Sequence, residues 1–123
     1  MSFVLPQNLP EIGVAVPILA AFTGHKRVPL WAVATNNANP KLRFYEAEIE
    51  LKVIKTHRRV WADVERVDAK LMGKTNLLTF DFVGTPWNFS VNVVLPPHLK
   101  ETLRFLASKN LTMTPRALDI LNS

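Results

Sequence analysis

The regular alternation of apolar and polar residues between positions 44 and 94 restricts the fold of this chain more than any other feature. Residues 45–53 alternate apolar and charged side chains without interruption, and residues 87–93 repeat the pattern with neutral polar partners. A period of two places one set of side chains on one face of a pleated strand and the other set on the opposite face. The pattern therefore predicts a β-sheet with one buried face and one face in water.

Turn-forming residues divide this stretch into short strands. The predicted turns and bends lie at residues 46–48, 63–67, 73–76 and 84–86. No gap between strands is long enough for a crossover helix, so neighbouring strands are expected to be antiparallel. The predicted inward-facing row includes Leu78, Phe80, Phe82, Trp87, Phe89, Val91 and Val93.

A helical pattern follows the last strand. Leu99, Leu103 and Leu106 lie at helical spacing after a proline pair, which suits the first turn of a helix. Thr114 and Pro115 predict the start of a second, short helix. We therefore expect a mainly β (α+β) fold, an antiparallel barrel or sandwich of about seven short strands capped by a C-terminal amphipathic helix.

Residues 1–27 are expected to form an apolar, proline-rich arm, with one short helical turn at residues 14–21. Prolines at this density disfavour a long helix or a central strand. The arm packs on the sheet, on a second copy of the chain or on a membrane surface, and these alternatives stay open. The candidate interface residues are Ile12, Val14, Val16, Ile18, Leu19 and Phe22. Residues 28–110 are then the β domain with its capping helix, and residues 111–123 a short helix and tail.

This order of elements resembles the pleckstrin-homology-like superfold, in its small bacterial and GRAM-type versions. The match covers residues 42–106, in which a patterned strand and a basic hairpin precede an aromatic-small-acidic-apolar-x-x-apolar motif. The motif reads Trp61-Ala62-Asp63-Val64-Glu65-Arg66-Val67. The resemblance implies that the C-terminal helix closes one open end of a barrel. It also implies a domain that binds lipid, peptide or protein. Residues 1–27 have no counterpart in the minimal fold.

Basic residues form two short groups in a chain whose net charge is +5. Such a charge favours anionic partners such as acidic lipid, nucleic acid or an acidic protein. On a hairpin tip, lysine and arginine donors suit a phosphate, although a solvated turn explains the same residues. The candidate anion-binding residues are Lys55, His57, Arg58 and Arg59, together with Lys26 and Arg27.

Other chemistries receive less support from the sequence. Tyr45, Trp61 and Trp87 fall in or beside inward-facing rows, so core packing explains them better than base stacking, and nucleic acid is disfavoured as a partner. The chain has no cysteine, and its three histidines are scattered, so no metal site, catalytic group or cofactor is predicted.

The apolar run at residues 12–22 is shorter than the roughly 20 residues that a membrane-spanning helix needs. The sequence thus predicts a soluble, cytoplasmic, non-catalytic binding or protein-interaction module that self-associates through its arm. The alternative is an anionic lipid- or phosphate-binding domain. A small enzyme or a nucleic-acid binder is a lesser alternative.

Overall fold

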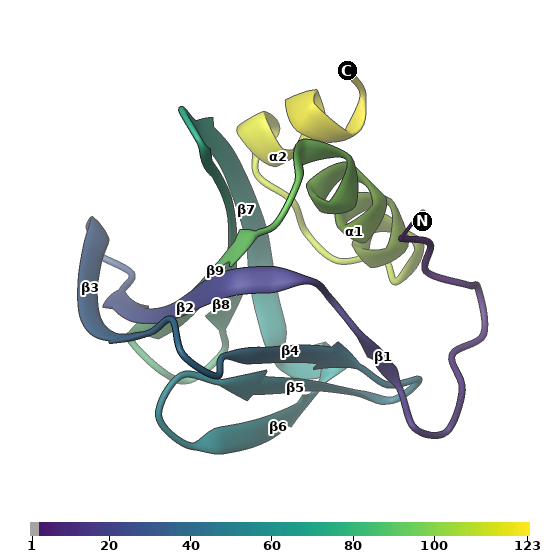
Figure 1. Ribbon diagram of the computed structural model, residues 1–123, viewed down its shortest axis with the longest axis horizontal. Coiled ribbons are helices and arrows are strands. Elements are labelled where there is room, and N and C mark those ends of the chain that lie inside the picture. The colour runs from purple at the N-terminus through teal and green to yellow at the C-terminus, as the bar shows by residue number, and fades with distance from the viewer. Residues whose placement is uncertain (1–2) are drawn as a thin grey trace.

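Two antiparallel sheets and two helices make up the fold (Figure 1). The computed structural model describes residues 3–123, and for residues 28–33 it describes the backbone alone. The strands are β1 (Val14–Ala15), β2 (Ile18–His25), β3 (Val28–Asn36), β4 (Lys41–Phe44), β5 (Glu48–Lys52), β6 (Thr56–Val60), β7 (Val64–Met72), β8 (Thr75–Phe82) and β9 (Trp87–Val93). A 3-10 turn (Trp61–Asp63) joins β6 to β7, and the helices are α1 (Pro96–Ser108) and α2 (Pro115–Leu121).

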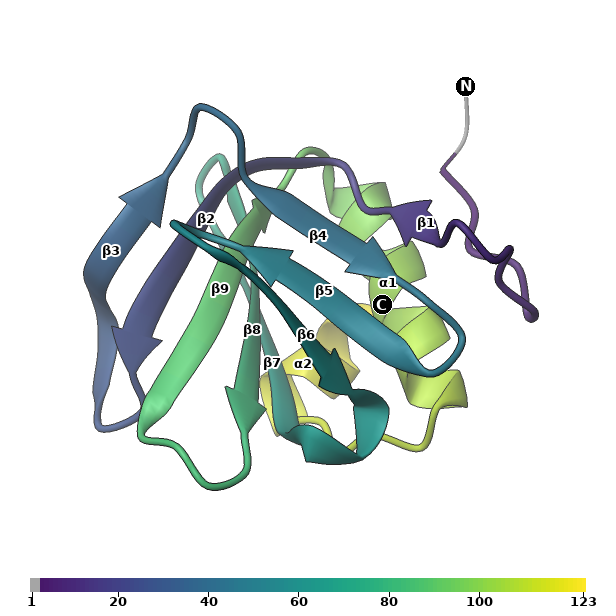
Figure 2. The same ribbon diagram turned by 90° about the horizontal axis from the view of Figure 1, so that it is seen from below.

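The two sheets are separate layers that cross over one another (Figure 2). The four-stranded sheet has the order β1-β4-β5-β6, and the five-stranded sheet has the order β3-β2-β9-β8-β7. Every strand pair is antiparallel, as the short turns require. The mainly β, antiparallel expectation is therefore confirmed. Over residues 3–123 the sheets do not close into one barrel, so the barrel alternative is not observed.

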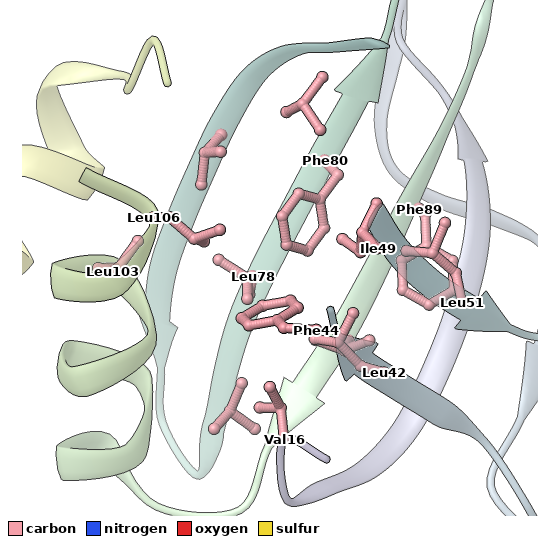
Figure 3. Close-up of a cluster of buried hydrophobic side chains, with 14 of the residues drawn as sticks. Val16, Leu42, Phe44, Ile49, Leu51, Leu78, Phe80, Phe89, Leu103 and Leu106 are labelled. Atoms are coloured by element: carbon pink, nitrogen blue, oxygen red, sulfur yellow. The ribbon is translucent and has the colours of Figure 1, made fainter. Parts of the chain in front are cut away.

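The core lies between the facing sides of the two sheets. In Figure 3, Phe44, Ile49 and Leu51 of the four-stranded sheet point toward Leu78 and Phe80 of the five-stranded sheet. The alternation read from the sequence explains this arrangement, because β4 and β5 present every second residue to the opposite sheet. The predicted turn at residues 46–48 is also present, between β4 and β5.

Helix α1 closes one end of the space between the sheets. Its predicted apolar stripe is confirmed, since Leu99, Leu103 and Leu106 are fully buried. The Phe105 ring stacks on Phe44 with the ring centroids 5.5 Å apart, which joins the helix to the four-stranded sheet. Proline at the start of α1 and the Thr114 cap of α2 agree with the sequence reading.

The N-terminal segment differs from the expectation. Residues 14–21 form no helical turn; instead β2 lies in the five-stranded sheet between β3 and β9. Pro17 allows this because it falls in the connection between β1 and β2, where it removes no hydrogen bond from the sheet ladder. The expected boundary at residue 27 therefore lies within the turn of the β2–β3 hairpin.

Residues 3–5 lie against α1, and residues 9–13 lie beside β4 and the β4–β5 turn, where the Leu9 amide donates to Glu46 Oε2 over 3.1 Å and the Ile12 carbonyl accepts from Arg43 Nε over 2.7 Å. The Leu5 side chain is buried, its amide donates to Glu101 Oε2 over 2.7 Å, and its carbonyl accepts from Arg104 Nη2 over 2.7 Å. Phe3 packs edge-on against His98 of the same helix. This part of the arm is thus attached to its own domain by both apolar and polar contacts.

The predicted absence of a membrane-spanning run has a structural counterpart. Across residues 3–123, neither α1 nor α2 has the length and apolar character needed to cross a bilayer.

Three carboxylates are held in the charged form by their neighbours. The Arg104 hydrogen bond is the largest influence on Glu101 and lowers its pKa. Burial acts to raise the pKa values of Asp68 and Glu50, but hydrogen bonds and positive charge outweigh it and lower both. For Asp68 these come from Arg116 and Thr114, so the carboxylate attaches the start of α2 to β7.

We expect stability to fall as the pH drops below the ordinary values of these groups, 3.8 for aspartate and 4.5 for glutamate. Because their folded pKa values are lowered, the unfolded chain takes up protons in this range before the folded chain does. Urea unfolding between about pH 6 and about pH 3 measures the effect. The Asp68→Asn variant, which cannot titrate at this position, should show a shallower decline; an identical decline would contradict the assignment.

Candidate functional site

A cleft of about 470 Å³ opens between the two sheets. The strand ends and turns that line it lie on the side of the fold away from α1 (Figure 2). One wall consists of β5, β6 and the turn that joins them. The other wall consists of parts of β2, β8 and β9 and the loop before β9. Its volume lies within the roughly 300–1,000 Å³ range of small-molecule sites.

The inner walls of the cleft are mostly apolar. Leu51 and Val53 contribute from the four-stranded sheet, and Phe82 and Phe89 from the five-stranded sheet. All four side chains are buried, because they belong to the inward-facing rows predicted from the two-residue period. Thr23 of β2, opposite Phe89, adds a hydroxyl to this wall.

Strand β6 divides the predicted basic cluster between two faces. In the antiparallel register His57 is opposite Leu51 and Arg59 is opposite Ile49, so these two side chains lie on the inner face. Arg58 is opposite Glu50 and lies on the outer face. The sequence reading grouped these residues, whereas strand geometry separates Arg58 from its neighbours.

Arg58 is committed to carboxylates on the outer face. Its Nε lies 2.9 Å from Glu50 Oε2, its Nη1 lies 3.8 Å from Glu48 Oε1, and its guanidinium stacks 4.4 Å from the Tyr45 ring centroid. Hydrogen bonding to Glu50 raises the pKa of Arg58. The contact also covers Glu50, which is buried although it lies on the face of the sheet that was predicted to be in water.

Arg59 connects β6 to the opposite sheet. Its Nε lies 3.2 Å from Asp63 Oδ2, its Nη2 donates to the Val83 carbonyl over 3.5 Å, and its guanidinium stands 4.9 Å from the Phe82 ring centroid. These contacts hold the guanidinium against one wall of the cleft and neutralise its charge. Inward-pointing charge on an edge strand also discourages pairing with another strand.

Lys55 and His57 are the donor side chains that remain at the mouth of the cleft. Both are exposed, and neither makes an ion pair or side-chain hydrogen bond with the residues whose side chains the structure describes. Their donors are therefore available to an anionic group on a bound molecule. This availability distinguishes them from Arg58 and Arg59.

The second basic group does not line the cleft. Lys26 Nζ donates to the Phe82 carbonyl over 2.7 Å and lies 3.3 Å from Glu65 Oε1. Arg27 is exposed at the tip of the β2–β3 hairpin. The predicted anion site thus separates into a cleft group (Lys55, His57 and Arg59), the outward-facing Arg58 side chain, and a hairpin group that Lys26 attaches to β7 and β8.

Trp87 was predicted to lie in the core, and this prediction is wrong. Its side chain is 45% exposed at the mouth of the cleft and packs edge-on against His25 at 5.4 Å. Trp87 does occupy an inward position, but as the first residue of β9 it lies beyond the cover of the four-stranded sheet. Its place directly after the turn at residues 84–86 was the available signal. Trp61, by contrast, is buried and donates to the Tyr45 carbonyl over 3.0 Å.

The six candidate interface residues do not share one surface. Val16 is buried in the core, and Val14, Ile18 and Phe22 are half-buried. Ile12 is 73% and Leu19 is 54% exposed. Only these last two side chains present large apolar surface for contact with another molecule.

No carboxylate side chain lines the cleft within the described part of the chain. No group of three potential metal ligands occurs among residues 3–123.

Comparison with known proteins identifies no relative: no family model matches the chain, and no curated protein matches it.

Proposed function

We propose that this chain is a non-catalytic binding module, and that its ligand occupies the cleft between the sheets and carries an anionic group. One observation supports this function best. The cleft combines buried apolar walls with two donor side chains, Lys55 and His57, that make no other ion pair or hydrogen bond with the described residues. Apolar clefts with a few convergent polar groups are the usual form of small-molecule sites.

Charge supports an anionic rather than a neutral ligand. The carboxylates near the mouth are already paired, Asp63 with Arg59 and Glu48 and Glu50 with Arg58. The charge of Lys55, which has no such partner among the described residues, therefore dominates the field at the opening, in a chain of net charge +5. A cytoplasmic location belongs to the proposal as well.

Kinship with the pleckstrin-homology-like superfold is a further part of the proposal. Its support is the succession of short antiparallel strands in two sheets, followed by an amphipathic helix at one end. The N-terminal strands β1 and β2 are additions to the pattern of about seven strands that the sequence suggested, which gives nine strands in residues 3–123.

Self-association is a second candidate function. The exposed Ile12 and Leu19 side chains favour it, because large apolar groups in water are stabilised by contact with another surface. Light scattering on the double variant Ile12→Ser with Leu19→Ser tests it. A monomeric wild-type chain at all concentrations would remove this candidate and leave the cleft proposal intact.

The proposal predicts that replacing both Lys55 and His57 by glutamine weakens binding of an anionic probe. Two exposed charge contacts of about 0.2–1 kcal/mol each correspond to a loss of roughly two- to thirtyfold in affinity. The probe is 8-anilinonaphthalene-1-sulfonate, and its fluorescence measures binding. Added salt should weaken wild-type binding more than it weakens binding to the variant.

The matched control is Lys70→Gln with Lys74→Gln, which removes two positive charges from β7 and the β7–β8 turn, outside the cleft. This variant should keep most of the probe affinity. Equal losses in the two double variants would assign the effect to net charge and contradict the cleft as the site.

A further inference from the structure

We infer that the cleft accepts a single-chain amphiphile with one terminal carboxylate, whose hydrocarbon chain lies between the sheets and whose carboxylate remains at the mouth beside Lys55 and His57. This inference rests on the proposed function and specifies the chemical class of its ligand.

Apolar side chains line the inside of the cleft and free donors lie at its mouth, and this separation determines the orientation of such a ligand. Leu51, Phe82 and Phe89 line the inner part of the cleft, and the guanidinium of Arg59 there is already neutralised by Asp63. The side chains with free donors are Lys55, on the turn between β5 and β6, and His57, on the edge strand β6. Both lie at the opening of the cleft. A charged group bound inside would lose its hydration without gaining an unpaired partner, so the charge belongs at the mouth.

The side chains with free donors at the mouth are a lysine and a histidine, and these favour a carboxylate over a phosphate group. Phosphate sites commonly use the fork of an arginine or a series of backbone amides at the start of a helix. Arg58 and Arg59 are both bound to carboxylates, and α1 begins away from the cleft. Lys55 and His57 instead supply single donors, which suit a carboxylate.

Exposed apolar side chains extend the cleft beyond its mouth. Ile54, next to Lys55, is 72% exposed, and Trp87 on the opposite wall is 45% exposed. A hydrocarbon chain that contacts both residues would remove this surface from water. Apolar surface thus continues from the inner walls of the cleft to its rim, beside the free donors of Lys55 and His57, which matches the two parts of an amphiphile.

Isothermal titration calorimetry with hexanoate, octanoate, decanoate and dodecanoate, each below its micelle concentration, tests the inference. Affinity should rise about fourfold with each added methylene until the cleft is full, and then level off. The matching primary alcohols should bind more weakly than the acids. The Lys55→Gln, His57→Gln variant should abolish that difference while keeping the dependence on chain length.

A second variant locates the chain. Thr23→Leu adds apolar volume to the inner wall of the cleft, so affinity should level off at a shorter chain. Unfolding midpoints of both variants establish that they remain folded. An unchanged plateau in the Thr23→Leu variant would overturn the inference that the chain lies between the sheets.

The outcomes separate this inference from the proposed function. Probe binding that depends on Lys55 and His57, together with alkyl carboxylates that show no dependence on chain length, would overturn the amphiphile and leave the anion-binding cleft. Binding to vesicles of phosphatidylserine and phosphatidylcholine, with no binding of free carboxylates, would overturn it in favour of a membrane surface. Absence of binding by every anion would overturn both proposals.

Discussion

Replacing Phe105 by alanine is expected to lower the free energy of unfolding by about 3–5 kcal/mol, the cost of removing a large ring from a packed core. Phe105 is fully buried in α1. Its ring stacks on Phe44 at 5.5 Å and meets Trp61 edge-on at 6.1 Å. The ring joins the helix to β4 and to the turn between the sheets, so no neighbouring side chain can fill its place without moving a whole element. Urea unfolding monitored by circular dichroism measures the loss.

Phe22→Ala is the matched control for Phe105→Ala. Phe22 is also a phenylalanine in a central element, but its ring is only half-buried and lies on the side of β2 away from the Ala21 and Thr23 positions. Less apolar surface returns to water when it is truncated, so its loss should be clearly smaller. Equal losses in the two variants would contradict the role of Phe105 as the link between helix and sheets.

Much of the β architecture could be predicted from the sequence, because local pattern and tertiary packing agree there. The two-residue period in β5 and β9 assigned the inward rows, and the spacing of Leu99, Leu103 and Leu106 assigned the buried face of α1. At these positions the local pattern and the packing of the complete fold bury the same side chains. The antiparallel pairing followed from the short connections.

The N-terminal strands could not be predicted, because their evidence is not local. Ala21 is buried in β2 only because β9, about 70 residues later, provides the partner for its backbone. The prolines around β2 suggested an irregular arm, yet Pro17 lies just outside the strand. A periodic pattern shows which face of a strand is buried, but it does not show which distant strand lies next to it in the sheet.

The candidate site was predicted in part. The residues at positions 55–59 do lie at one opening, but their charges have different partners, and those partners depend on the pairing of β5 with β6. The two-residue period of β6 by itself predicts that the Arg58 side chain lies on one face of the strand and the His57 and Arg59 side chains on the other. Trp87 was missed because an inward position at the end of a strand has no cover when the facing sheet is shorter.

The N-terminal arm supplies the second large effect, because Leu5 belongs to the core although it lies nine residues before the first strand. Leu5→Ala is expected to lower the free energy of unfolding by about 2–5 kcal/mol, since it opens a cavity beside α1. Glu101 and Arg104, which bind the Leu5 backbone, keep their contact with each other, so the loss arises mainly from the missing side chain. Urea unfolding measures it.

Val4→Ala is the control for Leu5→Ala, because Val4 is the neighbouring residue and is 64% exposed. It should change stability by no more than about 0.5 kcal/mol. The dependence of the unfolding midpoint on protein concentration then distinguishes the two roles proposed for the arm. If residues 3–13 stabilise their own domain, Leu5→Ala lowers the midpoint equally at all concentrations. A loss that disappears at high concentration would instead assign Leu5 to a contact between two copies of the chain, since association stabilises by mass action.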